Sequence, residues 1–268
     1  MARTSPRQER DAAVAAAEVA GALIRRAFGQ EQRVTLKAAR DIVTEVDTAS
    51  QAEILGVLRQ AGTGYGVLAE ESPMQPAANG ARWIVDPLDG TVNFSRGLPR
   101  FCVSIALERE GVVVLGVIFD PMADELFVAL AGQGATLNGR PIRVSRNRSW
   151  GGAIMSTGFP SGDWQASPAD GQAIAWIAAR VLAVRSTGSA ALDLADVACG
   201  RRDAHWERGL FPYDVGAGTL LVREAGGVVS DYRGGGDPLY AGEIVAANPV
   251  LHRRLIARLA ADHLETST

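Results

Sequence analysis

Two aspartates, Asp86 and Asp89, stand directly after a run of apolar residues that is typical of a buried strand. Pro87 lies between them, fixes its own φ and lacks an N–H, so the strand is predicted to end there with the Leu88 carbonyl unpaired. Carboxylates about 4 Å apart repel each other by roughly 4 kcal/mol at an effective dielectric constant of 20. A hard divalent cation would neutralise them, because it prefers oxygen ligands. The corner therefore predicts a metal site, although Asp, Pro and Gly also build ordinary solvated turns.

The next residues, Gly90 and Thr91, are predicted to begin a short helical turn. The first N–H groups of a helix have no partner within the helix and are suited to binding phosphate. The sequence thus places a metal site and an anion site at one corner.

Three further carboxylates stand at the ends of predicted elements. Glu70 ends a strand predicted at residues 67–70, so two strands deliver carboxylates to their carboxyl ends. Asp47 precedes a helix predicted over residues 48–60, and Asp214 precedes an apolar helix predicted over residues 215–225. Because aspartate is a favoured N-cap residue, Asp47 and Asp214 can also be explained as helix starts.

Other ionisable groups have structural explanations. Asp193 and Asp196 lie on a predicted helix and are expected on a solvated or capping face. The three histidines, His205, His252 and His263, have no Ser or Cys partner motif and are expected as surface or strand residues.

Length and periodicity indicate two α/β halves without a flexible linker. An Ala-rich amphipathic helix begins the chain, an extended pair or hairpin follows at residues 33–46, and a β-rich meander is predicted over residues 101–144. Short strands and helices alternate after residue 145. The expected division is an N-terminal α+β half, residues 1–144, and a C-terminal α/β half, residues 145–268.

Composition limits the possible partners and location. The 268 residues are 47% hydrophobic and carry a net charge of −3, so no basic excess is available to offset phosphates and direct nucleic-acid binding is not expected. Cys102 and Cys199 lie in apolar segments without metal-ligand spacing and are expected to be small buried residues in a reducing cytosol. No uncharged run is long enough to cross a bilayer. These features favour a cytoplasmic protein with no membrane partner.

Taken together, four segments resemble the inositol monophosphatase family of metal-dependent, lithium-sensitive phosphatases. In order, they are Glu-Glu-Ser at 70–72, Asp-Pro-Leu-Asp-Gly-Thr-Val-Asn-Phe at 86–94, Tyr-Asp-Val-Gly-Ala-Gly at 213–218 and Glu-Ala-Gly-Gly at 224–227. The resemblance covers nearly the whole chain. It implies an α/β (α+β) fold, a layered α-β-α-β-α sandwich of the inositol monophosphatase and fructose-1,6-bisphosphatase type, usually as a homodimer with Mg²⁺ as the working ion.

The resemblance also implies two or three Mg²⁺ ions per site. Glu70, Asp86 and the Leu88 carbonyl would hold the first ion, and a weaker third would lie by Glu70. Asp86, Asp89 and Asp214 would hold the second. Such a pair of ions can stabilise the attacking and leaving oxygens of an in-line displacement.

Catalysis and substrate binding are implied for further residues. Glu70 and Thr91 would position the attacking water, and Asp47 would orient Thr91. Glu207 would accept hydrogen bonds from sugar or cyclitol hydroxyls. The implied substrate-binding set is Asp89, Gly90, Thr91, Gly188, Ser189, Ala190 and Glu207.

Some residues depart from the family pattern. Tyr213 replaces a common Trp, and Arg208 and Phe211 are unusual at their positions. Lys37 lies closer to Asp41 than the family spacing implies and is left outside the site. These departures bear on the identity of the substrate more than on the reaction.

The leading hypothesis is hydrolysis of a phosphate monoester of a small polyol, with inositol 1-phosphate first among the candidates. Histidinol phosphate, fructose 1,6-bisphosphate and 3′-phosphoadenosine 5′-phosphate are alternatives within the same chemistry. A regulatory binding protein is the non-enzymatic alternative, because some bacterial members of the family also associate with the transcription machinery.

Overall fold

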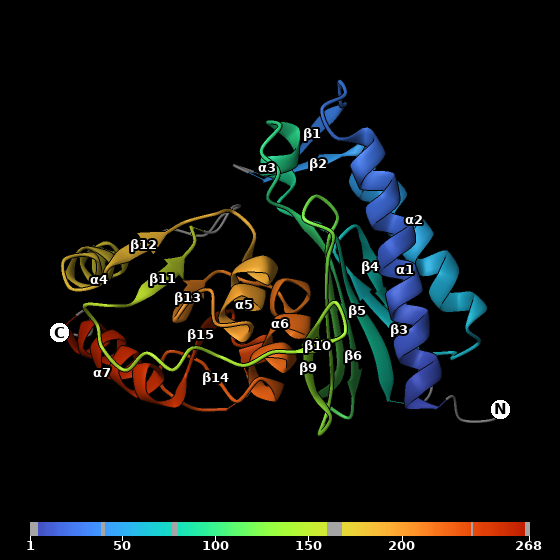
Figure 1. Cartoon of the computed structure of the whole chain (residues 1–268). Coiled ribbons are helices and arrows are strands. Elements are labelled where there is room, and N and C mark those ends of the chain that lie inside the picture. Colours follow the sequence, from blue (N-terminus) through green and yellow to red (C-terminus); the bar gives the residue numbers. More distant parts are fainter. Residues whose placement is uncertain (1–4, 39–40, 77–79, 160–167, 237, 266–268) are drawn as a thin grey trace.

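Helices and sheets alternate through the protein in five layers (Figure 1). The computed structural model describes residues 5–38, 41–76, 80–159, 168–236 and 238–265. Two helices cover one face of the large sheet, two lie between the sheets, and two cover the outer face of the small sheet, which confirms the predicted sandwich. In that order they are α1 (Pro6–Ala27), α2 (Glu45–Gln60), α5 (Ala190–Ala198), α6 (Pro212–Glu224), α4 (Pro168–Ala178) and α7 (Pro249–Glu265).

The large sheet contains the predicted meander and runs in the order β10-β9-β8-β7-β6-β5-β3-β4. Its strands are β3 (Gly66–Ala69), β4 (Ser72–Gln75), β5 (Ala81–Asp89), β6 (Cys102–Arg109), β7 (Val112–Asp120), β8 (Glu125–Leu130), β9 (Gly134–Leu137) and β10 (Arg140–Pro141). Strands β3 and β5 are parallel neighbours. Their carboxyl ends therefore meet at one edge of the sheet, where Glu70 and Asp86 lie.

The small sheet belongs to the second half of the chain and has the order β12-β11-β13-β15-β14. It is formed by β11 (Ile154–Thr157), β12 (Ala183–Arg185), β13 (Ala204–Arg208), β14 (Val228–Ser230) and β15 (Glu243–Ala247). The remaining elements are the hairpin of β1 (Val34–Ala38) and β2 (Asp41–Thr44), the short helix α3 (Thr91–Ser95) and the 3-10 turn η1 (Pro238–Tyr240).

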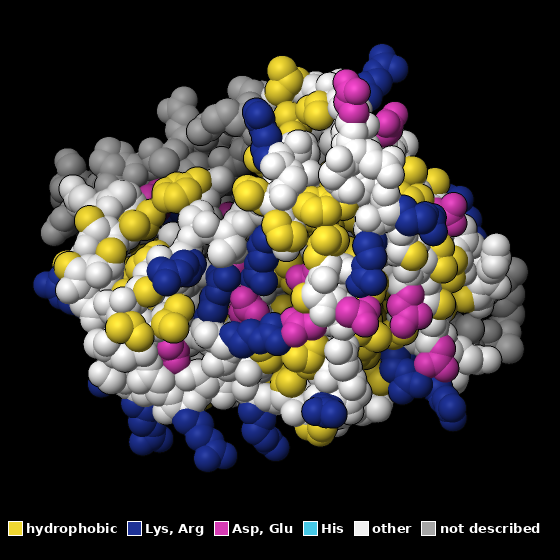
Figure 2. All heavy atoms as spheres, turned by 45° about the horizontal axis from the view of Figure 1, so that its top comes forward, with side chains coloured by type: hydrophobic (Ala, Val, Ile, Leu, Met, Phe, Trp, Pro, Cys, Tyr) yellow, Lys and Arg dark blue, Asp and Glu magenta, His cyan; other side chains and the backbone are white. Residues whose placement is uncertain are grey.

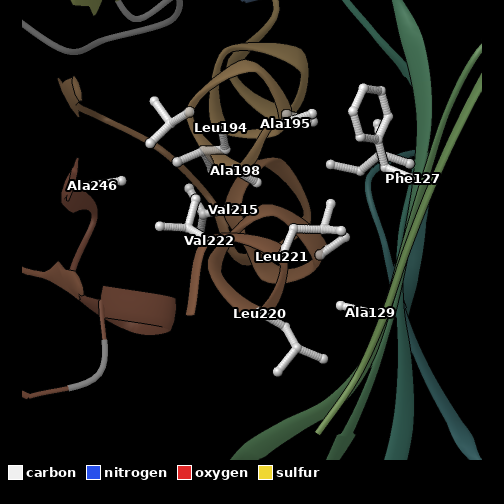
Figure 3. Close-up of a cluster of buried hydrophobic side chains, with 14 of the residues drawn as sticks. Phe127, Ala129, Leu194, Ala195, Ala198, Val215, Leu220, Leu221, Val222 and Ala246 are labelled. Atoms are coloured by element: carbon white, nitrogen blue, oxygen red, sulfur yellow. The ribbon is translucent and has the colours of Figure 1, made fainter. Parts of the chain in front are cut away.

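The central helices α5 and α6 are apolar on two sides because each lies between the large sheet and the small sheet. In Figure 3, Leu194, Val215 and Leu221 lie between Phe127 of the large sheet and Ala246 of the small one. This packing fixes the two sheets on one pair of helices, and the site lies near the amino-terminal ends of that pair.

Helix α2 begins earlier than the sequence pattern predicts. Thr44 is its N-cap, and the Asp47 carboxylate accepts hydrogen bonds from the Thr44 N–H and hydroxyl. The predicted start at residue 48 is wrong, because this capping box lies one turn before the ones identified in the sequence.

Strand β5 does not end at Pro87 as predicted. It continues to Asp89, and its pairing with β6 shifts register between Asp86 and Asp89. A bulge tolerates proline because the extra residues are outside the hydrogen-bond ladder.

The predicted amphipathic α1 is confirmed, with Ala13, Ala17 and Ile24 fully buried. Among the described residues, no helix is long and apolar enough to span a membrane.

Candidate active site

A cavity of about 480 Å³ brings the predicted metal and substrate residues together. Its lining includes Glu70, Asp86, Leu88, Asp89, Gly90, Thr91, Gly188, Ser189, Ala190, Glu207 and Asp214. Asp47 lies behind this surface and reaches it through Thr91, whose Oγ1 is 2.7 Å from Asp47 Oδ1. Residues from both halves of the chain therefore form one concave, acidic site.

The bulge in β5 sets the directions of the polar groups at the corner. Asp86 Oδ1 accepts a hydrogen bond from the Leu88 N–H at 3.0 Å, and the Ser50 hydroxyl donates to the Pro87 carbonyl at 2.7 Å. The Leu88 carbonyl was predicted to be unpaired, but it lies 3.0 Å from Thr91 Oγ1. The difference arises because the turn at Gly90 folds Thr91 back over the bulge.

Gly90 occupies a position that requires glycine. Its φ is +98°, and a Cβ atom there would lie 2.9 Å from the Arg100 carbonyl oxygen and 3.2 Å from that of Gly188. The close approach brings the loop before α5 against the start of α3. Asn93 secures this contact by donating from Nδ2 to the Thr187 carbonyl at 2.7 Å.

Asp89 is held from the second half of the chain. Its Oδ2 accepts hydrogen bonds from the Ser189 hydroxyl at 2.6 Å and from the Ala191 N–H at 2.8 Å. Both donors belong to the amino-terminal end of α5, whose N-cap is Ser189. The carboxylate therefore ties the large sheet to the central helices.

Asp214 enters the site from the first turn of α6. Its Oδ2 accepts a hydrogen bond from the Phe211 N–H at 2.6 Å, so Phe211 is the N-cap and Asp214 is the third helical residue. The expectation that Asp214 is the N-cap is therefore wrong, because the N-cap lies three residues earlier. The same expectation is wrong for Asp47, which is also the third residue of its helix. A carboxylate here is still favoured by the helix dipole.

Burial, helped by neighbouring negative charges, raises the pKa of the carboxylates in the cavity. Burial, followed by the charges of Glu70, Asp89 and Asp214, raises the pKa of Asp86 well above its usual value. Burial and the Asp89 charge do the same to Asp214. For Asp89, burial raises the pKa to about 7 against the lowering effect of the hydrogen bonds from Ser189 and Ala191. A concentration of negative charge of this kind favours cation binding.

The donor set suits a hard cation. Asp86, Asp89 and Asp214 each accept hydrogen bonds through one oxygen, and in the described part of the chain the other oxygen of each accepts none. These free oxygens belong to residues that line the cavity. Among the described residues, however, no three His, Cys, Asp or Glu side chains already form a coordination cluster.

Lys37 is a site residue that the sequence analysis left out. Its Nζ is 2.9 Å from Glu70 Oε1 and also forms an ion pair with Glu71. Burial lowers the pKa of Lys37, but the charges and hydrogen bonds of the two glutamates outweigh burial and raise it. The hairpin of β1 and β2 brings the ammonium group to the site, and no local motif in the sequence indicates this contact.

Asp193 and Asp196 are buried, contrary to the prediction of a solvated face. Arg100 Nη2 lies 2.7 Å from Asp196 Oδ2, and Arg202 Nη1 lies 2.6 Å from Asp193 Oδ1. The arginines come from segments before and after α5, so helix periodicity alone does not reveal the pairing. This cluster supports the amino-terminal end of α5 beneath the cavity.

Two histidines are buried. His205 lies on strand β13, which confirms the expected strand placement, and is 0% exposed. His252 is 6% exposed on helix α7, so the expectation of a surface or strand residue is wrong for it. The side chain of His263 lies outside the described residues. Cys102 is buried as predicted, whereas Cys199 is only partly buried.

The surface around α3 and the β1–β2 hairpin carries charges of both signs (Figure 2). On the part of this face that the structure describes, Lys and Arg side chains are interspersed with Asp and Glu, and neither sign covers a broad area. This distribution agrees with the small net charge of −3.

The comparisons with known proteins agree with the geometry of the cavity. Residues 5–265 match the model of the inositol monophosphatase family. The chain is 44% identical over 252 residues to an inositol-1-monophosphatase of Mesorhizobium japonicum, with 91% of this chain and 92% of that protein covered. It is 42% identical over 250 residues to the Nus factor SuhB of Escherichia coli, with 92% and 94% covered.

A solved structure shows the same fold. The extragenic suppressor protein suhB of Bartonella henselae superimposes with a TM-score of 0.88 at 41% identity, and the match covers 93% of this chain and 97% of that one.

Proposed function

Because the chain belongs to the inositol monophosphatase family, we propose that it is a Mg²⁺-dependent phosphatase for a phosphate monoester of a small polyol, with inositol 1-phosphate as the leading substrate. Family membership supports a phosphatase, and the finer assignment rests on the cavity. The observation that carries it is that Asp86, Asp89 and Asp214 line one cavity together with Glu207.

The carboxylates would hold Mg²⁺ through oxygens that accept no other hydrogen bond. Glu70, Asp86 and the Leu88 carbonyl would hold one ion, and Asp86, Asp89 and Asp214 a second, with a weaker third near Glu70. When bound, Mg²⁺ supplies Lewis-acid stabilisation of the attacking and leaving oxygens. Phosphoryl transfer then depends mainly on positioning and charge neutralisation, so no protein nucleophile is required.

The protein's own groups position the attacking water. Thr91 Oγ1 carries one proton, and donation to the Asp47 carboxylate is favoured over donation to the Leu88 carbonyl, because a charged acceptor makes the stronger bond. The lone pairs of Oγ1 are then available to accept a proton of a water molecule in the cavity. Glu70 would accept the other proton of that water.

Substrate recognition would come from the second half of the chain. The loop of Gly188, Ser189 and Ala190 borders the cavity next to Gly90, and Glu207 offers two acceptor oxygens to adjacent hydroxyls. We therefore keep the proposed division at residue 144, with most metal ligands before it and the specificity residues after it. A homodimer is part of the proposal, because the family resemblance implies it.

A panel of phosphate esters tests this function. We expect inositol 1-phosphate to be hydrolysed faster than histidinol phosphate, fructose 1,6-bisphosphate and 3′-phosphoadenosine 5′-phosphate. It alone among these esters combines a ring of neighbouring hydroxyls for Glu207 with a single phosphate, and a second phosphate is disfavoured by the acidic cavity. Phosphate release is measured with Mg²⁺ and again after chelation by EDTA, which should abolish it. Turnover that persists in EDTA would contradict the metal requirement, and a faster alternative ester would replace the named substrate.

Lithium provides a separate test of the second metal position. Li⁺ is a small, hard cation, and we expect it to compete for the carboxylate oxygens of Asp89 and Asp214 and to reduce turnover at fixed Mg²⁺. Phosphate release is measured over a millimolar lithium chloride series, with sodium chloride at equal ionic strength as control. Equal rates in the two salts would count against the assignment of these two aspartates.

A regulatory role is the second candidate, because the relatives include the Nus factor SuhB of Escherichia coli. Affinity purification from lysate, with wild-type protein and an Asp86→Asn variant as bait, separates this role from catalysis. RNA polymerase or ribosomal RNA retained by both baits, with no phosphatase activity in either, would favour the regulatory candidate over the enzyme.

A further inference from the structure

Glu207 is bordered by a buried histidine on its own strand. His205 precedes it by two residues on β13, so the two side chains project from the same face of the sheet. His205 Nε2 lies 3.4 Å from Glu207 Oε2, and the imidazole is 0% exposed. Among the described residues, no other side chain forms an ion pair with Glu207, which makes His205 its charged or polar support.

The other side of the imidazole is held by the protein interior. His205 Nδ1 lies 3.0 Å from the hydroxyl oxygen of Ser156, which is itself fully buried on β11. Asp193 Oδ2 is the next acceptor, 3.7 Å from Nδ1. The Ser156 hydroxyl can donate to Nδ1 or accept from it, and when it donates, the imidazole proton lies on Nε2, where it is directed at Glu207.

The geometry leaves Nε2 as a buried nitrogen without a hydrogen bond of normal geometry among the described residues. With the proton on Nε2, this nitrogen is a buried donor without an acceptor, which is costly, so a small movement of Glu207 towards Nε2 is favoured. Hydrogen bonds of this kind often shorten when substrate binds.

Gly158 limits the movement of Glu207 on another side. A Cβ atom at Gly158 would lie 2.0 Å from Glu207 Oε1, so the carboxylate packs directly against the glycine backbone. The carboxylate is therefore confined between the backbone of Gly158 and the imidazole of His205.

From these contacts we infer that His205 is a positioning residue that fixes the Glu207 carboxylate for hydrogen bonding to substrate hydroxyls. The inference rests on the proposed function, and it concerns recognition of the polyol rather than attack on phosphorus. Ser156 sets the orientation of the imidazole, and Gly158 provides the space that the carboxylate occupies.

The test compares two substrates in two His205 variants. His205→Phe removes both nitrogens, and we expect it to raise KM for inositol 1-phosphate about tenfold while kcat changes less than about twofold, because only binding of the hydroxyls is weakened. For p-nitrophenyl phosphate, whose leaving group has no hydroxyls for Glu207, both constants should be unchanged. His205→Gln keeps an N–H donor and should restore most of the affinity.

Two other variants separate positioning from general stability. Gly158→Ala should displace the Glu207 carboxylate and raise KM for inositol 1-phosphate in the same selective way. His252→Phe is the matched control, because His252 Nε2 forms a similar buried contact with the Ser230 hydroxyl at 2.9 Å but does not line the cavity. It should lower the melting temperature without changing KM.

An equal rise in KM for inositol 1-phosphate and for p-nitrophenyl phosphate in His205→Phe would overturn the inference. An unchanged KM for inositol 1-phosphate in this variant would also overturn it. Failure of the proposed function would be seen in the unaltered protein, as no hydrolysis of any polyol phosphate. In that case crystal structures of the unaltered protein and of His205→Phe still decide the inference, because a fixed Glu207 should be displaced only in the variant.

Discussion

Replacing Asp86 with asparagine is expected to lower phosphate release by more than about 100-fold, because loss of a group that only supports a metal ligand already costs about 10-fold to 100-fold. Asp86 is assigned to both metal positions, and asparagine provides a neutral and weaker ligand. Phosphate release from inositol 1-phosphate over a Mg²⁺ series measures the effect, and excess Mg²⁺ should not restore the rate.

The same substitution is expected to stabilise the protein in EDTA. Asparagine can keep the hydrogen bond from the Leu88 N–H, and it removes a carboxylate whose charged form is opposed first by burial and then by the charges of Glu70, Asp89 and Asp214. Each 1 kcal/mol of relieved repulsion corresponds to about 2–4 °C in melting temperature for a chain of roughly this size. A higher melting temperature together with lost activity indicates a functional carboxylate, because replacement of a structural carboxylate would lower the melting temperature.

Asp120→Asn is the matched control for Asp86→Asn. Asp120 is also buried, but its Oδ1 accepts hydrogen bonds from the Met122 and Ala123 N–H groups in a turn, and it does not line the cavity. Activity should survive this change. Full activity in Asp86→Asn protein would refute the proposed metal site.

Replacing Thr91 with valine is expected to lower kcat about 100-fold, at the low end of the usual effect of a group that assists proton transfer. Valine preserves the shape of the side chain but has no hydroxyl to bridge Asp47 and the attacking water. KM should change little if the group acts mainly in the transition state. Steady-state kinetics with inositol 1-phosphate give both constants.

Thr91→Ser keeps the hydroxyl and serves as the control for Thr91→Val. It should retain activity within about tenfold, because serine has the same donor and acceptor groups but a less restricted χ1. If valine and serine had the same effect, the hydroxyl would have no role and the proposed positioning of water through Asp47 would be wrong.

The parts of the site that follow from local signals were predictable from the sequence. Parallel strands β3 and β5 bring Glu70 and Asp86 to one sheet edge, as the carboxylates at the ends of two apolar runs indicated. The family resemblance implied the contribution of Asp214, which local signals alone left open between a ligand and a helix start.

Other features depend on contacts between distant segments. Proline normally stops a central strand, so the sequence favoured an end at Pro87, whereas the register shift against β6 accommodates it. Asp193 and Asp196 resemble a solvated helix face until Arg100 and Arg202 are placed beside them. Helical periodicity cannot report partners that lie on other elements.

Lys37 is a second example of a contact between distant segments that the sequence pattern does not reveal. Its separation from Asp41 along the chain gave no reason to include it, but the β1–β2 hairpin brings its ammonium group to Glu70 and Glu71. Hairpin geometry, rather than spacing along the chain, determines this contact.

The hydrogen bonds from Ser189 and Ala191 to Asp89 bear on how the protein matures during translation. The ribosome makes Asp89 a hundred residues before Ser189, and Asp214 later still. A nascent chain that contains only the first half therefore lacks both the groups that orient Asp89 and the last of the proposed metal aspartates, Asp214. Under the proposed function, phosphatase activity through this site therefore requires translation to pass Asp214.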